Sequence, residues 1–254
     1  MKKDILAVVA LLSLFMVVAC KKTNTAPPAT SCRMMTQTSA YSGNTQCYYD
    51  DYQRILKLRY VTQPADTSWD IYHYDNGHVD YLVRLYKGTD GDTIYYTFTS
   101  GRYVEVTQYA SRLVYLYNTS GKLVKIEHYE GSKITDYSVY LYNLLGNCIL
   151  CTQFALYDTT YLPIQVTDLE FGDLRNPYSS MGLPPLNSHG PEIGVYLSPN
   201  NITKIRTQFT GQPAKMVFLY HYTASNENGY PTTYSITDSL NYPILENNIS
   251  YICP

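Results

Sequence analysis

The sequence predicts an all-β protein: an antiparallel meander of tyrosine-rich hairpins, curved into an open or closed barrel-like sheet, with few or no helices. Three observations predict it. A short Tyr-x-Tyr motif recurs along the chain, and 29 of the 254 residues are tyrosine, which is among the best strand formers. Between residues 50 and 160, apolar positions nowhere keep a 3.6-residue period over three turns, so helices are not expected there.

The repeating unit is a Tyr-x-Tyr pair, then Asn or Asp, then glycine. Aromatic residues at i and i+2 point to the same face of a strand, and Asn or Asp shortly before Gly supplies the positive φ of a tight reversal. After the glycine a second run of period two begins, as in residues 123–129, so each copy is a strand, a turn and a strand. The copies lie at residues 72–77, 96–101, 115–121 and 140–146, with an expanded copy at 220–229.

The N-terminal segment is predicted to be a signal rather than part of the fold. Lys2 and Lys3 precede an apolar run at residues 5–19, which is shorter than the roughly 20 residues of a spanning helix. Residues 1–19 therefore predict a signal peptide that is removed. The segment Val17-Val-Ala-Cys20 resembles the lipobox of bacterial lipoproteins, in which the cysteine is acylated. That resemblance makes Cys20 the lipid attachment point.

The chain after the signal divides into two parts. Residues 20–31 are rich in Thr, Ala and Pro and predict a tether behind the acylated cysteine, and residues 32–254 predict a single all-β domain. The expected partner is the membrane, through the N-terminal lipid, and the expected location is the outer membrane. Lys21 and Lys22 are not followed by the acidic residues of surface-export signals, which favours the periplasmic side slightly over the cell surface. The oligomeric state is left open.

The composition and the cysteines exclude some classes of function. A net charge of −2 offers no basic surface for nucleic acid. Cys148 and Cys151 form a CxxC inside a predicted strand, where they are about 10 Å apart and can pair only if the strand bulges. No second CxxC or His pair stands at zinc spacing, so no metal and no cofactor is predicted. The five cysteines after Cys20 are odd in number, and their pairing stays open: Cys32, Cys47, Cys148, Cys151 and Cys253.

Two resemblances accompany the repeat. The pattern of residues 115–123 (YLYNTSGKL) is similar to the YD repeats of large secreted shell-forming and toxin-associated proteins, although His78 stands where Arg or Lys is usual. The whole chain resembles uncharacterised Gram-negative lipoproteins that contain a domain of unknown function with a porin-like fold. This second resemblance covers the lipobox, the hairpins and the segments 176–178, 200–204 and 229–232. It implies a curved or barrel-like sheet and brings no established activity.

A barrel that spans the membrane is not expected. In the strand at residues 122–129, Lys125 and Glu127 share one face and His128 lies on the other, whereas a lipid-facing wall needs one apolar face.

The proline-rich segment 173–200 interrupts the hairpins. Two interpretations stay open for this segment, a cap that closes one end or face of the sheet and a loop that contacts a ligand.

The leading functional hypothesis is a lipid-anchored envelope protein that acts as a non-catalytic binding or scaffolding module, with a glycan or a peptide as possible ligand. Phenol rings suit binding because they join a large apolar body to a hydrogen-bonding tip, although they can equally pack the sheet. The alternative is an envelope hydrolase that cleaves glycans with a carboxylate pair in the sheet cleft, drawn from Glu105, Glu127, Asp136, Asp168, Glu170 and Glu192. No catalytic residue is singled out. The candidate ligand-binding residues are Tyr72, Tyr74, Tyr115, Tyr117, Tyr140, Tyr142, Tyr220 and Tyr222.

Overall fold

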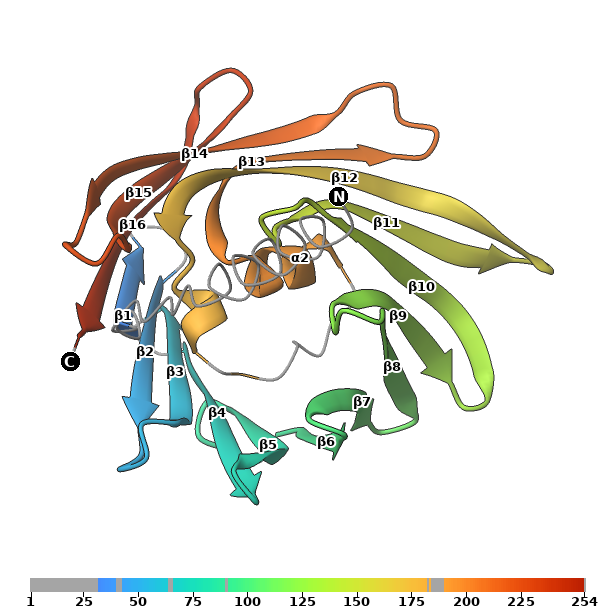
Figure 1. Cartoon of the computed structure of the whole chain (residues 1–254), viewed down its shortest axis with the longest axis horizontal. Coiled ribbons are helices and arrows are strands. Elements are labelled where there is room, and N and C mark those ends of the chain that lie inside the picture. The colour runs from blue at the N-terminus through green and yellow to red at the C-terminus, as the bar shows by residue number, and fades with distance from the viewer. Residues whose placement is uncertain are drawn as a thin grey trace, which may run out of the picture. The chain divides into compact units, whose positions relative to one another are not determined.

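Strand after strand pairs with its neighbour in sequence until the last strand meets the first. The computed structural model describes residues 32–253 except 40–42, 64–65, 90, 182 and 184–189. Within these residues sixteen antiparallel strands form one closed barrel, because β1 pairs with β16 (Figure 1). The predicted all-β meander is confirmed, and the sheet is closed rather than open.

The strands are β1 (Arg33–Ser39), β2 (Gly43–Tyr49), β3 (Ile55–Gln63), β4 (Asp66–Asp75), β5 (His78–Tyr86), β6 (Thr93–Thr99), β7 (Arg102–Gln108), β8 (Ser111–Tyr117), β9 (Leu123–Glu130), β10 (Lys133–Tyr142), β11 (Cys148–Tyr157), β12 (Thr160–Arg175), β13 (Asn200–Phe209), β14 (Met216–Ser225), β15 (Pro231–Asp238) and β16 (Pro243–Ile252). The predicted signal peptide, Cys20 and the tether lie outside the described residues. No helix in the described part of the chain is long and apolar enough to cross a membrane.

Alternate turns of a meander lie at the same end of the barrel. The Asn-Gly turns of the repeat therefore all lie at one of the two ends. We call this the repeat end; it holds the turns β2–β3, β4–β5, β6–β7, β8–β9, β10–β11 and β14–β15, together with Cys32 and Cys253. The long connection from β12 to β13 also leaves from and returns to the repeat end, and the other turns lie at the opposite end.

The turns of the repeat explain its Asn and its Gly. The Oδ1 of Asn118 accepts hydrogen bonds from the backbone N–H groups of Ser120 (3.1 Å) and Lys122 (2.9 Å), and Gly121 has a φ of 79°. Asn226 is used in the same way, and Asn143 accepts one such bond from Asn147. A side-chain acceptor that replaces a backbone turn is the reason Asn is favoured at this position.

Side chains on the inner face fill much of the barrel, and those on the outer face include ion pairs. Tyr72, Tyr115, Ile126 and Tyr140 are buried inside. On the outer face Lys125 Nζ lies 2.8 Å from Glu127 Oε1. Period two therefore holds along these strands.

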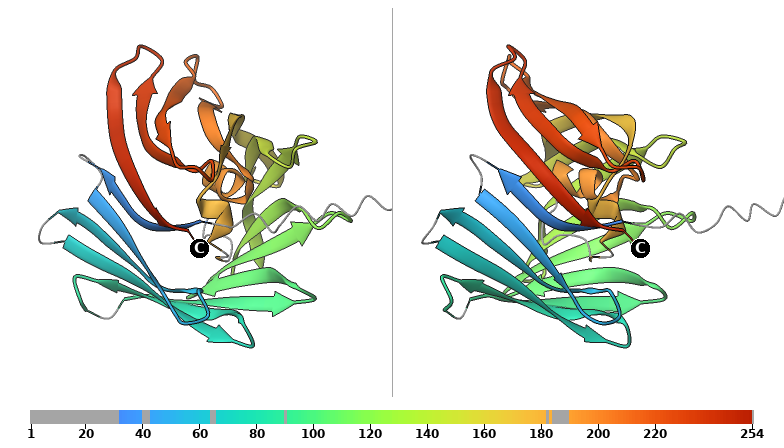
Figure 2. Two further views of the ribbon diagram at one scale, coloured as in Figure 1. Left: turned by 60° about the vertical axis from the view of Figure 1, so that its left-hand side comes forward. Right: turned by 90° about the vertical axis from the view of Figure 1, so that its left-hand side faces the viewer.

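The described residues of the proline-rich segment lie inside the ring of strands rather than across its end (Figures 1 and 2). It forms a short 3-10 helix, η1 (Tyr178–Ser180), and one helix, α2 (Pro191–Leu197). Pro191 occupies the first helical position, where its missing N–H costs nothing. Gly194 packs so closely on β11 that a Cβ there would lie 2.8 Å from Cys148 Sγ. These described residues thus form an internal plug, packed against the inner wall.

A buried asparagine holds the plug in shape. Asn176 Nδ2 donates to the carbonyl oxygens of Val195 (2.6 Å) and Ser198 (2.8 Å), and the Tyr140 phenol of β10 donates to the Gly190 carbonyl at 3.2 Å. These bonds satisfy polar groups that the barrel would otherwise bury without partners.

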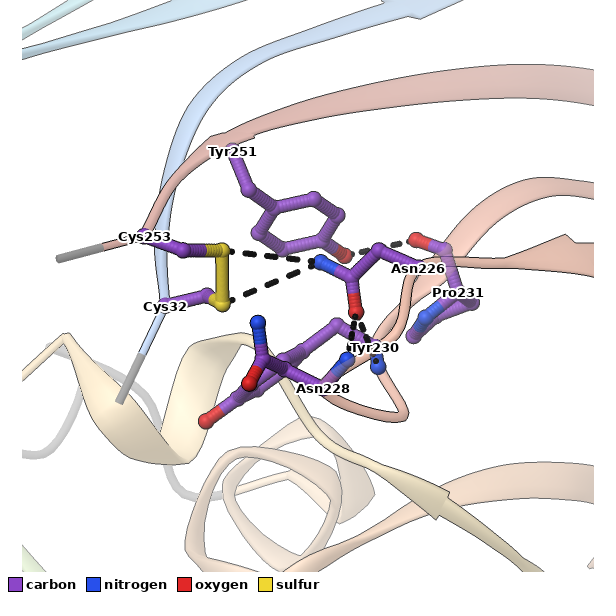
Figure 3. The surroundings of a disulfide bond; sticks show 7 residues. All are labelled: Cys32, Asn226, Asn228, Tyr230, Pro231, Tyr251 and Cys253. Carbon is purple, nitrogen blue, oxygen red and sulfur yellow. Dashed lines mark hydrogen bonds between the residues drawn. A yellow bond between two sulfur atoms is a disulfide. The ribbon is translucent and has the colours of Figure 1, made fainter. Parts of the chain in front are cut away.

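A disulfide between Cys32 and Cys253 joins the start of β1 to the residue after β16. Asn226 Nδ2 lies 3.8 Å from both sulfur atoms, and Figure 3 shows this amide between the disulfide and the turn that follows β14. Cys47, Cys148 and Cys151 are buried free thiols. The pairing that the sequence left open is therefore one disulfide and three thiols, and the CxxC is unpaired.

Candidate functional site

The eight tyrosines named from the sequence lie on the inner wall in two roles. The first tyrosine of a pair packs in the core, since Tyr72, Tyr115 and Tyr140 are all less than 9% exposed. The second tyrosine of a pair reaches the repeat end and donates its hydroxyl to a backbone carbonyl of the adjacent strand. A ligand-binding role for the set stays a prediction, and packing together with backbone hydrogen bonding accounts for most of its members.

The second tyrosines bridge gaps between hairpins. Pairing of β9 with β10 stops at Lys125 and Val139, two residues before the repeat end of β9, and the Tyr142 hydroxyl donates to the Leu123 carbonyl at 2.7 Å. Six bridges of this kind are present among the described residues, each 2.6–2.7 Å long. They run from Tyr49 to Met34, Tyr74 to Ile55, Tyr117 to Tyr103, Tyr142 to Leu123, Tyr222 to Ile202 and Tyr251 to Pro231. The phenol takes the place of a ladder hydrogen bond where neighbouring strands diverge.

A second feature accompanies four of these bridges. The residue directly before the carbonyl acceptor places a cation over the tyrosine ring: Arg54 lies 4.3 Å from the centroid of Tyr74, and Lys122 lies 5.1 Å from that of Tyr142. Arg33 and Arg102 do the same over Tyr49 and Tyr117. Where the repeat has Phe98 instead of Tyr, His78 stacks on the ring at 4.2 Å. His78, which departs from the YD pattern, thus stacks on Phe98, which replaces the second tyrosine in its copy of the repeat.

The candidate binding site is a cavity of about 490 Å³ between α2 and the inner face of β13–β16, within the range of small-molecule sites. A smaller space of about 140 Å³, lined in part by Tyr222 and Tyr234, shares Tyr178, Val195, Tyr220 and Ile236 with it. Ile244, at the start of β16, is 41% exposed and lies at the mouth. The main cavity is lined by Tyr178, Pro191, Glu192, Val195, Tyr196, Ile205, Thr207, Phe218, Tyr220, Ile236 and Ile244.

Two phenols of this cavity differ from the bridging ones. The hydroxyls of Tyr196 and Tyr220 make no hydrogen bond to any other described residue, and burial raises the pKa of each to about 12. Both are therefore neutral donors at physiological pH, set in a wall that is aliphatic and aromatic apart from Glu192 and Thr207. Of the eight predicted tyrosines, Tyr220 and Tyr222 line this space.

An ion pair lies on the inner wall between β4 and β5. Arg84 Nε and Nη2 donate to the two oxygens of Asp70 at 2.7 and 2.9 Å, and the Asp70 side chain is 3% exposed. The Tyr60 hydroxyl lies 3.4 Å from the same carboxylate. A bidentate pair of this kind fixes the register of β4 and β5 and satisfies the buried charge.

A hydrogen-bonded Ser-His-Asp relay crosses β8, β9 and β10 near the opposite end. Ser111 Oγ is 2.9 Å from His128 Nε2, and His128 Nδ1 is 2.8 Å from Asp136 Oδ2. Ser111 and Leu113 are two residues apart, so the serine faces the inside like the buried Leu113. The histidine and aspartate side chains are 19% and 21% exposed. With the proton of the ring on Nδ1, facing the carboxylate, Nε2 accepts from the serine, which is the arrangement that activates a serine hydroxyl.

The other carboxylates considered from the sequence are spread over the molecule. Glu105, Glu127, Asp168 and Glu170 form ion pairs with cations on the outer wall, and Glu192 lies on α2 beside the cavity. Among the described residues no group of three or more His, Cys, Asp or Glu side chains is placed to hold a metal ion.

The closed barrel has a counterpart among solved structures. The chain shares the fold of a porin-like protein from Bacteroides uniformis. The two align over 89% of this chain and 98% of the other with a TM-score of 0.54 at 14% identity. A porin-like protein from Bacteroides vulgatus aligns over 87% and 99% with a TM-score of 0.49 at 10% identity. No protein-family model matches the chain, and no curated protein matches it either.

The expected porin-like fold is therefore confirmed. At such low identity the likeness concerns the fold alone, so membership of the lipoprotein family and the kinship with YD repeats stay predictions.

The structure of this chain also shows two copies of the repeat that the sequence pattern missed, and these copies end in Tyr49 and Tyr251. Tyr49 follows Cys47 instead of a first tyrosine, and its turn has Gln53 at a φ of 65° in place of glycine. The Ser-His-Asp relay was missed because its members carry no local motif.

Proposed function

We propose that this chain is a lipid-anchored protein of the outer membrane whose barrel binds a small amphipathic ligand, such as a short apolar peptide, in the cavity beside α2. The observation that carries the proposal is that two phenols of the cavity lining, Tyr196 and Tyr220, make no hydrogen bond to the described residues. Aliphatic and aromatic walls with a few polar groups are typical of ligand sites. They favour an apolar or peptidic ligand over a glycan, which needs many polar partners.

Attachment through Cys20 and a position outside the hydrocarbon layer belong to the same proposal. Two observations support them: the plug occupies the barrel, and charged pairs such as Lys125–Glu127 and Arg206–Asp168 lie on the outer wall. Charges that face lipid near the midplane cost about 2–4 kcal/mol each. The lipobox supplies a lipid anchor, so the barrel need not span the membrane. The periplasmic side is proposed because no acidic export signal follows Cys20.

The proposal is tested by thermal unfolding of the full-length protein in detergent, with panels of short peptides, medium-chain amphiphiles and glycans. A ligand at a hundred times its Kd stabilises by about 2.7 kcal/mol, a shift of several degrees for a chain of this size. Ile236→Trp is expected to fill the cavity and abolish the shift, whereas Val166→Trp on the outer wall leaves it unchanged. A folded protein that no panel member stabilises contradicts the binding function.

A second candidate function follows from the Ser-His-Asp relay: hydrolysis of small carboxylic esters. Ser111 Oγ would attack the ester carbonyl while its proton passes to His128 Nε2, and the imidazolium would then protonate the departing alcohol. Water would release the acid from the acyl-serine by the same steps in reverse order. The rate is expected to be low, because Ser111 is paired to β7 and β9 on both sides, so its backbone is committed to the ladder rather than to an oxyanion.

This candidate is tested by ester hydrolysis and by fluorophosphonate labelling. The expected result is a label on Ser111 that Ser111→Ala and His128→Ala both abolish, with Ser120→Ala in an exposed turn as the matched control. Labelling that persists in Ser111→Ala, or no labelling of the folded protein, rejects the hydrolase and leaves the binding function untouched.

A further inference from the structure

The turn between β10 and β11 presents two leucines to solvent. Leu144 is fully exposed and Leu145 is 76% exposed, and Leu141 and Ile149 on the flanking strands are 52% and 41% exposed. The equivalent turn of the preceding hairpin carries Thr119 and Ser120 at these two positions. The repeat therefore does not require apolar residues here.

The turn is held firmly, so the leucines do not fold back onto the barrel. Asn143 and Asn147 close it with backbone hydrogen bonds and a side-chain bond of 3.0 Å. Asn147 is buried and exchanges two hydrogen bonds of 3.1 Å with Asn200 at the start of β13. Two leucines that a rigid turn keeps in water contribute no hydrophobic stabilisation, and they gain it only when another apolar phase receives them.

The turn lies at the repeat end, where the chain enters the barrel at Cys32. Residues 20–31 span at most about 40 Å when fully extended, so an anchor at Cys20 keeps this end near the membrane. Tyr52, in the β2–β3 turn of the same end, is 81% exposed with Arg54 5.2 Å from its ring. Lys122 lies beside the leucine turn, close to Gly146. Exposed tyrosine and cations next to leucine suit a headgroup boundary.

Exposure alone does not select this end. The opposite end exposes Tyr109, Leu240 and Tyr242 to 78%, 73% and 66%. The point of entry of the tether decides between the two, because the disulfide fixes Cys32 to the repeat end.

We propose that the Leu144–Leu145 turn inserts into the headgroup region of the membrane that holds the lipid anchor, so that the barrel stands on its repeat end. The turn then acts as a second contact that sets the orientation of the domain, with the cavity mouth at Ile244 directed away from the bilayer. This inference rests on the proposed anchor at Cys20.

The test uses the lipidated full-length protein in vesicles with and without brominated acyl chains, which quench nearby tryptophan. Leu144→Trp and Leu240→Trp are matched variants, since both replace an exposed leucine in a turn, one at each end. Their signal is measured above that of Trp69 in the unaltered protein. Quenching of most of the added fluorescence in Leu144→Trp, with none in Leu240→Trp, is the expected result.

The outcomes separate the anchor from the turn. A protein that does not float with the vesicles, in all three forms, rejects the anchor and the inference with it. Flotation without selective quenching of Leu144→Trp leaves the anchor standing and overturns the inference. Thermal unfolding of each variant establishes that it is folded, and both sites are exposed enough for tryptophan to fit.

Discussion

The hydroxyl of Tyr142 donates a 2.7 Å hydrogen bond to the Leu123 carbonyl, across a gap where β9 and β10 have stopped pairing. The residue before the acceptor, Lys122, covers the ring of the same tyrosine. Two residues that belong to different copies of the repeat therefore complete one structural unit. This relationship explains why the second tyrosine, the turn and the following cation recur together.

Removing the bridge should cost stability without changing the fold. Tyr142→Phe leaves the Leu123 carbonyl without its donor, and the expected loss is about 1–2 kcal/mol of unfolding free energy. Tyr95→Phe is the matched control, because Tyr95 is 57% exposed and makes no hydrogen bond to the described residues. Urea unfolding of both variants measures the difference, and equal stabilities would show that the bridge contributes nothing.

The ion pair on the inner wall is expected to depend on both partners. Arg84→Met leaves Asp70 buried and unpaired, which costs toward the lower end of about 3–5 kcal/mol, because the Arg84 side chain is 35% exposed. The double variant Asp70→Leu, Arg84→Met removes the orphaned charge and should recover most of the loss. Chemical denaturation measures the unfolding free energy of both variants. A double variant that is less stable than the single variant would contradict this account.

The disulfide should stabilise the seam of the barrel. Cys32 and Cys253 enclose a loop with a sequence separation of 221, and loss of such a cross-link typically costs about 2–4 kcal/mol. Replacing both residues with serine should lower the Tm by several degrees. A reducing agent should produce the same shift in the unaltered protein and none in the double variant; a further shift in the variant would point to another redox-sensitive group.

Alkaline pH should unfold the protein through its buried phenols and thiols. Burial raises the pKa of Tyr74, Tyr117 and Cys148 to about 12 from ordinary values of 10 for tyrosine and 9 for cysteine. The folded state keeps these protons when the unfolded state has lost them. Stability is therefore complete below about pH 9 and falls as the pH rises toward 12.

Tyrosinate absorbance and far-UV circular dichroism, recorded together during this titration, provide the check. Most phenols should ionise only as the strands are lost. A majority that ionises near pH 10 with the sheet intact would mean that the phenols are accessible to solvent.

The sequence by itself determined the strand-turn-strand unit, the antiparallel order and the placement of Asn and Gly in the turns. These features depend on contacts between residues close in the chain: alternation along a strand, and an Asn side chain that bonds to the N–H groups two and four residues ahead. The placement of Lys125 and Glu127 on one face of the strand and His128 on the other followed for the same reason.

Only the tertiary structure decided how the barrel closes and what fills it. The pairing of β1 with β16, the disulfide between Cys32 and Cys253, and the bridge from each tyrosine to a neighbouring hairpin join residues whose separation the local pattern does not encode. The plug is the clearest case, since its prolines indicated an irregular segment but not its place inside the wall. The cavity beside α2 and the relay of Ser111, His128 and Asp136 arise in the same way: each is assembled from separate strands, and it exists only once the sheet has curved enough to bring those strands together.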